Sequence, residues 1–205
     1  MTVLSVPASQ QFVPVDSEQL PLPRQVNTLL GHSAELQPLV LRSVFARTRR
    51  LDQLGILVGD NRFDAYTLAR LGAAHGIDPW TLTAQVEVSR AFTCHQLHHR
   101  VTNLSIAKLF KWSALYVLGF LELFYDEDIA QEEARRLLVA SLARLKELAA
   151  GGWPVLITMA RPPSKSNRDA FVEMVVEASD AYWEPSTFAL SEPVLQQLEF
   201  AMMNR

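Results

Sequence analysis

A phosphate-binding turn is the first chemistry that the residue pattern suggests. The apolar run Val26–Leu30 reaches a glycine, a short polar turn follows, and a helical pattern begins at Pro38. Strand, glycine turn and helix form the layout of a phosphate loop, where backbone amides and a lysine hold phosphates and a hydroxyl holds Mg²⁺. Here Leu36, Gln37 and Pro38 stand where a second glycine, the lysine and the hydroxyl belong. The sequence therefore predicts a degenerate phosphate loop, which comprises Gly31, His32, Leu36, Gln37 and Pro38.

A basic loop is the second candidate site. The segment RPPSKSNR follows the last apolar run and carries Arg161, Lys165 and Arg168. Ligands of open α/β sheets collect at the carboxyl ends of strands, and Arg and Lys are the usual donors to phosphate. The three side chains are therefore candidate contacts to the phosphates of DNA or of a ligand. A solvated basic turn explains the same residues, and the loop has no aromatic residue on which bases could stack.

One helical segment concentrates thiol and imidazole groups. Cys94 and His98 are four residues apart, as are His95 and His99, so each pair faces one way and could ligate zinc. No second cluster supplies the remaining ligands, because the other histidines are His32 and His75. The pattern favours packed or surface histidines, and we expect neither a metal nor another cofactor.

Two further charge clusters stand out along the chain. Arg42, Arg47, Arg49 and Arg50 lie near the end of a predicted helix, where cations favour the helix dipole. An acidic run follows the fourth apolar segment and comprises Glu122, Asp126, Glu127, Asp128, Glu132 and Glu133. A charged loop with an acidic first helical turn explains this run, and an edge that meets a basic neighbour in an assembly is the alternative.

Composition excludes several classes of protein. The chain has 205 residues, a formal net charge of −3 and a single cysteine, Cys94, so no intrachain disulfide can form. A reducing cytoplasm is the expected location. No apolar run approaches the roughly 20 residues of a membrane span, and the N-terminus lacks the pattern of a secretory signal. The negative net charge argues against blanket attraction to nucleic acid or anionic membrane.

The elements that must position these residues alternate between strand-like and helical patterns. Short apolar runs predict strands at 26–30, 54–59, 84–89, 114–120 and 153–160. Helical patterns cover 38–50, 65–75, 93–109 as one or two helices, and 129–150. The segment 171–180 completes the fold without a clear pattern, and 195–203 favours a final amphipathic helix. The alternation predicts an α/β fold with a mostly parallel sheet and helices on both faces. Residues 1–25, rich in Pro, Gln and Ser, predict an extended arm, and residues 26–205 one domain.

The order of these segments resembles the core domain of the RecA-like recombinase family, closer to the RadA type. ILVGDNRFDAYTLARLGAAHGID resembles the family's second strand, acidic turn and helix. VEVSRAFTCHQLHHRV is similar to a strand, Arg-Ala-aromatic and His-Gln helix, and ALYVLGFLELFYDEDIAQEEARRLLVASLARLKELA to the strand of the metal-associated Asp and the long helix. GWPVLITMA resembles the last core strand, which a DNA-binding loop follows. The likeness covers residues 26–190 and implies a three-layer RecA-like domain.

The departures from the family fall on its catalytic positions. The resemblance places the metal-associated Asp near Gly119 and the next polar residue near Phe120, and neither can hold a metal. The family's catalytic Glu aligns with Asp60, a shorter acid, and Arg90 matches a family position that also suits a buried ion pair. Since phosphoryl transfer depends on electrostatic stabilisation, we expect no useful ATPase activity.

The resemblance implies a non-catalytic protein that acts as a binding or scaffolding partner in DNA recombination or repair. Its partner would be an active RecA/RadA-type recombinase or a second copy, with weak DNA contact. The polymerisation signal of the family, aromatic-x-x-Ala, is absent, because the nearest match, Phe12-Val13-Pro14-Val15, departs at its last position. The alternatives are a nucleotide-binding ATPase with an unconventional phosphate loop, helped by arginines such as Arg161, and a function outside DNA metabolism.

Overall fold

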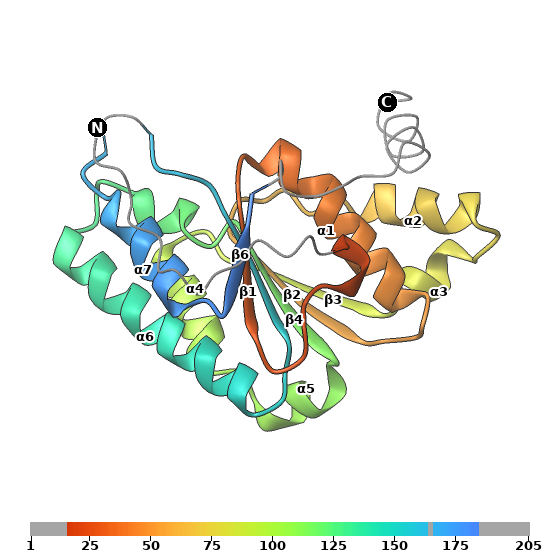
Figure 1. Ribbon diagram of the computed structural model, residues 1–205. Helices are drawn as coiled ribbons and strands as arrows, with labels where there is room; N and C mark the ends of the chain where they lie inside the picture. Colours follow the sequence, from red (N-terminus) through yellow and green to blue (C-terminus); the bar gives the residue numbers. More distant parts are fainter. Residues whose placement is uncertain (1–15, 164–165, 185–205) are drawn as a thin grey trace.

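The apolar runs form one parallel sheet with helices on both faces. The computed structural model describes residues 16–163 and 166–184. Six strands lie in the order β3-β2-β4-β5-β1-β6, and every neighbouring pair is parallel. This three-layer α/β arrangement matches the predicted RecA-like fold class (Figure 1). The strands are β1 (Val26–Leu30), β2 (Leu54–Val58), β3 (Val86–Arg90), β4 (Ala114–Leu118), β5 (Val155–Met159) and β6 (Ala181–Trp183).

The four inner strands have continuous apolar sequences because helices cover both of their faces. Every residue of β1, β2, β4 and β5 is buried. Strand β3 lies at an edge of the sheet, and its residues are half-buried or exposed, with Val88 and Arg90 the most exposed. The difference is the usual one between inner and edge strands of a parallel sheet.

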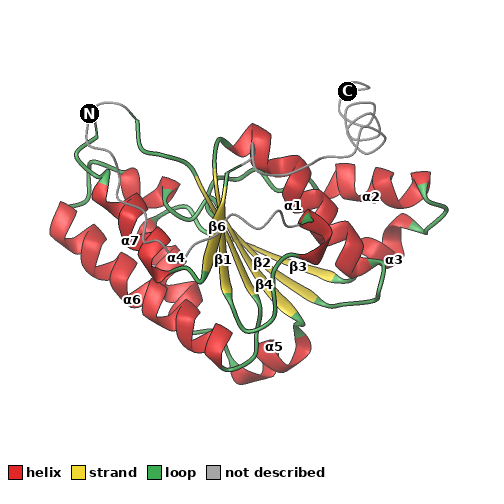
Figure 2. Cartoon of the chain, in the orientation of Figure 1, coloured by secondary structure: helices red, strands yellow, loops and turns green. Residues whose placement is uncertain are grey.

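The helices divide between the two faces of the sheet (Figure 2). One apolar core packs the first three helices, which are α1 (Ser33–Thr48), α2 (Ala65–Ala74) and α3 (Pro79–Thr83). The other core packs the remaining four, α4 (Cys94–Thr102), α5 (Ile106–Lys111), α6 (Gln131–Ala150) and α7 (Ala170–Ala178). Two short 3₁₀ helices are η1 (Ser17–Gln19) and η2 (Glu122–Tyr125). No helix among the described residues is both long and apolar enough to cross a membrane.

The segment before β1 lies against α1. The Leu20 side chain is fully buried, and its carbonyl accepts hydrogen bonds from Ser43 Oγ at 2.7 Å and Arg47 Nε at 3.1 Å. Arg42 Nε donates to Glu18 Oε1 at 3.0 Å. Two of the four clustered arginines therefore hold the chain that enters the domain, which the helix-dipole interpretation did not include. Residues 1–15 of the predicted arm lie outside the described residues.

The five predicted strands are confirmed within two residues, and the helix boundaries differ more. Helix α1 begins at Ser33 rather than Pro38, because His32 caps it and the polar turn is much shorter than predicted. The 93–109 pattern forms two helices, α4 and α5. Helix α3 and the short strand β6 were not predicted as separate elements. The predicted final helix at 195–203 lies outside the described residues.

Candidate functional site

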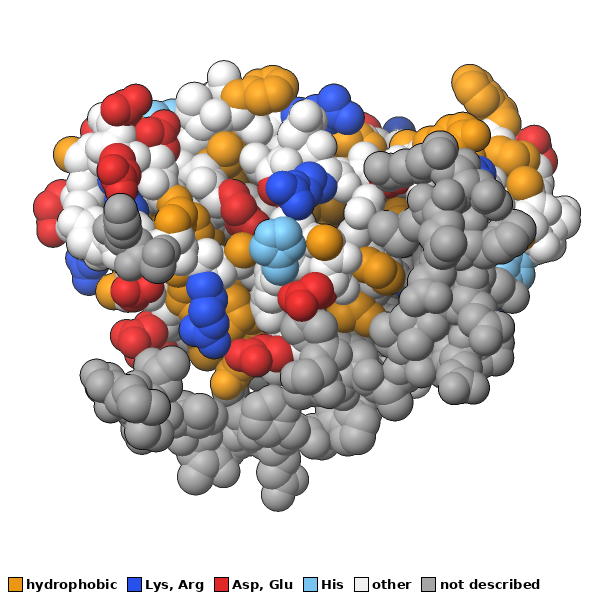
Figure 3. Space-filling view, turned by 90° about the horizontal axis from the view of Figure 1, so that it is seen from above, with side chains coloured by type: hydrophobic (Ala, Val, Ile, Leu, Met, Phe, Trp, Pro, Cys, Tyr) orange, Lys and Arg blue, Asp and Glu red, His pale blue; other side chains and the backbone are white. Residues whose placement is uncertain are grey.

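Polar side chains gather where β1, β2, β4 and β5 end. The carboxyl ends of parallel strands are where ligands of open α/β sheets bind. Figure 3, which views the molecule from above, shows acidic, basic and histidine side chains close together in the middle of this face. The predicted degenerate phosphate loop, Asp60 and Arg161 all contribute to this region.

The N-terminus of α1 is closed by its own side chains. Only Gly31 and His32 separate β1 from α1. His32 Nδ1 accepts the Ala34 amide at 3.4 Å, and Glu35 Oε2 accepts the His32 amide at 3.2 Å, which forms a capping box. In a phosphate loop such amides face the anion. Here the Glu35 carboxylate accepts the His32 amide and places its own negative charge at the positive end of the helix dipole.

The other residues of the predicted degenerate loop lie inside α1. Leu36 is buried in the core, and Gln37 Nε2 donates to the Arg62 carbonyl at 3.3 Å. Pro38 is within the helix and has no amide hydrogen to offer. These residues build the second turn of a helix that packs on the sheet, so they cannot wrap around a ligand.

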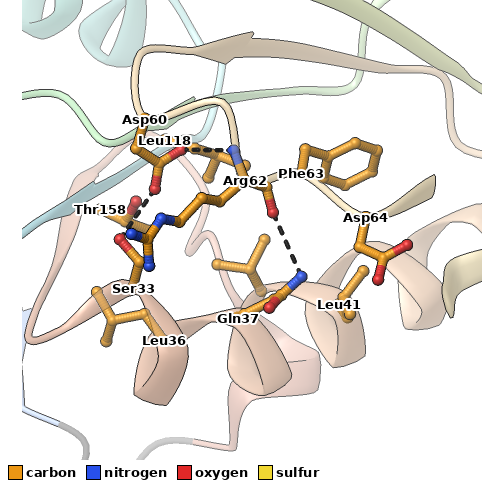
Figure 4. Close-up of a pocket in the computed structure, with 11 residues that line it drawn as sticks. Ser33, Leu36, Gln37, Leu41, Asp60, Arg62, Phe63, Asp64, Leu118 and Thr158 are labelled. Carbon is orange, nitrogen blue, oxygen red and sulfur yellow. Dashed lines mark hydrogen bonds between the residues drawn. The ribbon is translucent and has the colours of Figure 1, made fainter. Parts of the chain in front are cut away.

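Asp60, which follows β2, lies beside the start of α1 (Figure 4). Its Oδ2 accepts the Ser33 hydroxyl at 3.0 Å, and its Oδ1 accepts the Arg62 amide at 3.1 Å. Figure 4 shows the Arg62 side chain reaching back toward Ser33. The cavity that these residues border, with Gln37, Leu118 and Thr158 among its walls, measures about 20 Å³. That volume holds about one water molecule, far less than a nucleotide.

Gly119 occupies the position that the resemblance gives to a metal-associated Asp. Its φ is +62°, and a Cβ built there would lie 2.4 Å from Asp60 Cβ. The Gly119 amide donates to Thr158 Oγ1 at 3.0 Å. Phe120 is fully buried and its ring centroid lies 5.5 Å from that of Phe124. Only glycine fits at 119 while Asp60 remains in place, so an Asp at this position would clash.

Glu122 supplies a second carboxylate at this edge. Burial raises its pKa to about 7, and the negative charge of Asp60 adds to the increase. The Glu122 Oε2 atom is buried and has no hydrogen-bond partner in the described part of the chain. Glu122 is therefore the one residue of the predicted acidic run that belongs to the site.

A wider cleft of about 410 Å³ lies beside the α1 terminus, at the ends of β1, β5 and β6. Arg161 Nη2 contacts Glu184 Oε1 at 3.1 Å across it, and Glu35 lies in the same wall. Two carboxylates thus face one guanidinium, and that guanidinium is already paired. This charge balance disfavours a triphosphate. The residues that line the cleft are Leu30, Gly31, His32, Glu35, Ala160, Arg161 and Glu184.

The three candidate DNA contacts do not form one surface. Arg161 is exposed and paired with Glu184. Arg168 is only 3% exposed, and its guanidinium donates to the carbonyls of Phe124 and Ile129. Arg168 therefore holds the loop after β4 in place and does not present its charge to a backbone phosphate. Lys165 lies outside the described residues.

The Cys/His segment forms separate contacts along α4. Cys94 is buried, His98 Nδ1 lies 3.1 Å from Ser141 Oγ, and His95 Nε2 lies 3.7 Å from Glu133 Oε1. Burial lowers the pKa of His98. Within the described residues no three His, Cys, Asp or Glu side chains come close enough to hold a metal ion.

Three residues of the site, Ser33, Arg62 and Thr158, were not singled out from the sequence. Ser33 and Arg62 follow closely after the ends of β1 and β2, and Thr158 is the second-to-last residue of β5. Proximity to a strand end is the signal that could have found them. No protein-family model and no curated protein matches this chain.

Proposed function

We propose that this protein is a non-hydrolysing RecA-like protein that acts as a binding or scaffolding partner in DNA recombination or repair. The observation that carries the proposal is the capping box of α1, in which Glu35 places a negative charge at the helix N-terminus. The resemblance to RadA-type core domains supplies the setting, and the single buried cysteine is compatible with a cytoplasmic location.

The absence of nucleotide binding follows from charge and space. A phosphate at the start of α1 would have to displace the Glu35 carboxylate from the His32 amide. It would also lie near Asp60 and Glu184, and no lysine among the described residues lines either cavity. Like charges held within a few ångströms repel, and a buried or half-buried site screens that repulsion poorly. The domain keeps the scaffold of an ATPase without its electrostatic machinery.

A protein partner is supported by exposed aromatic residues on α2 and α3. Trp80 is 80% exposed and Tyr66 is 72% exposed. Helices α2 and α3 pack on each other at one end of the molecule (Figure 2). Large aromatic residues are enriched at protein interfaces. We assign this surface to the protein partner, an active RecA/RadA-type recombinase or a second copy of the chain.

The rival function is a nucleotide-binding ATPase with an unconventional phosphate loop. Ser33, Asp60 and Glu122 favour it, because a hydroxyl and two carboxylates at the ends of neighbouring strands could bind Mg²⁺. The same groups already satisfy one another or lie buried, so we give priority to the scaffold function.

A nucleotide titration separates the two functions. The purified full chain is titrated with a fluorescent ATP analogue and Mg²⁺ up to about 1 mM, the weak end of specific affinity. We expect no saturable signal. Saturable binding that unlabelled ATP competes away would support the rival, and hydrolysis lost in Asp60→Asn would then establish it.

A second experiment tests the partner surface. The full chain is mixed with the intact recombinase of the same cell, and complex formation is followed by size-exclusion chromatography. We expect the double change Tyr66→Ser and Trp80→Ser to weaken the complex at least about 10-fold, since aromatic hot spots contribute 2 kcal/mol or more. Val139→Ser, which removes an exposed apolar residue on α6, is the matched control. A complex that is absent, or equally stable in both variants, contradicts the assignment.

A further inference from the structure

One stretch of this acidic protein carries only positive charge. The chain has 22 Asp and Glu residues, yet none lies between Glu87 and Glu122. The stretch holds four cations, which are Arg90, Arg100, Lys108 and Lys111. In a chain of formal net charge −3 this segregation makes a local electrostatic feature that the overall charge conceals.

The fold brings these four cations to the edge of the sheet formed by β3. Arg90 is the last residue of β3, and Arg100 Nη1 from α4 donates to Ser89 Oγ at 2.7 Å. From α5, Lys108 and Lys111 both pair with the Glu87 carboxylate. Two lysines therefore share one carboxylate, Arg100 lies beside Ser89 on the same face of β3, and Arg90 lies on the opposite face at the end of the strand. No strand of the described residues pairs with the outer side of β3.

Two exposed aromatic rings belong to the same stretch of the chain. Phe92 follows β3 and is 69% exposed, and Phe110 lies between the two lysines of α5 and is 79% exposed. The Phe110 and Trp153 rings form a T-shaped pair with centroids 6.2 Å apart. This contact holds the Phe110 ring in one orientation. Exposed rings of this size are costly in water and commonly mark a binding surface.

We infer that the β3–α4–α5 edge binds single-stranded nucleic acid. Its cations contact the phosphates and the Phe92 and Phe110 rings stack on bases, the combination of charge and stacking that single-strand binders use. An acidic peptide would satisfy the cations but would leave the rings without planar partners, so the rings favour a polynucleotide. The inference rests on the proposed function only for its setting in DNA metabolism, and it places nucleic acid away from Arg161 and Arg168.

The Glu87 carboxylate competes with any bound phosphate for Lys108 and Lys111. It accepts a hydrogen bond from Lys108, which lowers its pKa, and it also attracts Lys111. A phosphate must compete with this carboxylate for both ammonium groups. Removal of the Glu87 charge should therefore tighten binding, the opposite of what a damaged structure would do.

The test measures fluorescence anisotropy of labelled 20-nucleotide oligo(dT), oligo(U) and a DNA duplex against the full chain, at about 50 and 200 mM salt. Lys108→Gln with Lys111→Gln should weaken single-strand binding at least about 10-fold and reduce the log–log salt slope by about 1.4, or 0.7 for each contact. Phe92→Ala should cost about 10-fold through lost stacking. Glu87→Gln should tighten binding several-fold. Arg135→Gln with Arg136→Gln on α6 removes the same charge elsewhere and should change little.

The outcomes are distinct. Preference for oligo(dT) or oligo(U) tells whether DNA or RNA is the source of the ligand. The inference is overturned by absence of binding at about 50 mM salt, by tighter binding of the duplex, or by equal loss in the α6 control. It is also overturned if oligoglutamate binds as tightly as the oligonucleotide. None of these results would restore nucleotide binding at α1 or remove a recombinase complex, so failure here is separate from failure of the proposed function.

Discussion

The start of α1 and the edge at β3 differ in whether their polar and aromatic groups have partners within the chain. At α1 the amides and charges are satisfied by neighbours in the same chain, with Glu35 and His32 as the caps. At β3 two lysines share Glu87, two arginines lie along the same edge strand, and two aromatic rings remain exposed. Groups that already have partners in the chain stabilise the fold. Excess charges and exposed rings can instead form favourable contacts with a ligand. Position at a strand end therefore does not by itself locate function.

Gly119→Asp should produce the largest effect on the closed region. The new side chain would clash with Asp60 Cβ at 2.4 Å and would require φ near +62°. We expect a loss of more than about 3 kcal/mol in the free energy of unfolding, measured by urea denaturation. Gly76→Asp is the control, because Gly76 has φ +68° with no atom within 4 Å of its Cβ position. Its loss should be about 1–2 kcal/mol, and equal losses would mean that the region can open.

Arg168→Met should come next. The change leaves the carbonyls of Phe124 and Ile129 without their buried donor, so we expect a loss of about 3 kcal/mol by chemical denaturation. Arg161→Gln removes an exposed ion pair and should change stability by less than about 1 kcal/mol. If the two variants were equally stable, Arg168 would be available to a ligand after all.

Glu122→Gln should remove a pH dependence of stability. The folded-state pKa of Glu122 is about 7, above the ordinary value of 4.5 for this carboxyl group, so the folded state holds the proton more tightly. The stability that this proton contributes is present below about pH 4.5 and is lost as pH rises toward 7. At pH 8 the variant should be about 1–3 kcal/mol more stable than the parent. Glu127→Gln, at an exposed residue, should not alter the profile, and an unchanged profile in Glu122→Gln would mean that the carboxyl group is solvated.

Glu35→Gln should have the smallest effect. The amide oxygen can still accept the His32 amide, while the favourable carboxylate–dipole interaction is lost, about 0.5 kcal/mol in thermal unfolding. ATP binding should remain absent because no lysine of the described part of the chain lines either cavity near α1. Saturable ATP binding by this variant alone would mean that the Glu35 carboxylate blocks ATP from the α1 N-terminus. The α1 region would then be a binding site, as we propose for the β3 edge.

The sequence predicted the sheet well because continuous apolar runs have few alternatives once helices cover both faces. It misplaced the start of α1, since a Pro commonly opens a helix, whereas Pro38 lies inside one and His32 provides the cap. The direction of the Arg168 side chain could not be predicted, because its acceptors, the carbonyls of Phe124 and Ile129, are about 40 residues away. The steric requirement for Gly119 likewise depends on the close approach of β2 and β4. Local sequence patterns therefore predicted most of the strands and helices. The arrangement of side chains in the site depends on contacts between segments far apart in the sequence.

The position of β1 in the sheet has a consequence for synthesis on the ribosome. Both of its neighbours come from the far end of the chain, with Val26 opposite Val155 and Asn27 opposite Ala181. At about 5–20 residues per second, the ribosome needs on the order of 10 s to produce the first of these partners. During that time an apolar strand with unpaired edges is exposed to other nascent chains. The protein should therefore depend on chaperones during translation more than its modest length suggests.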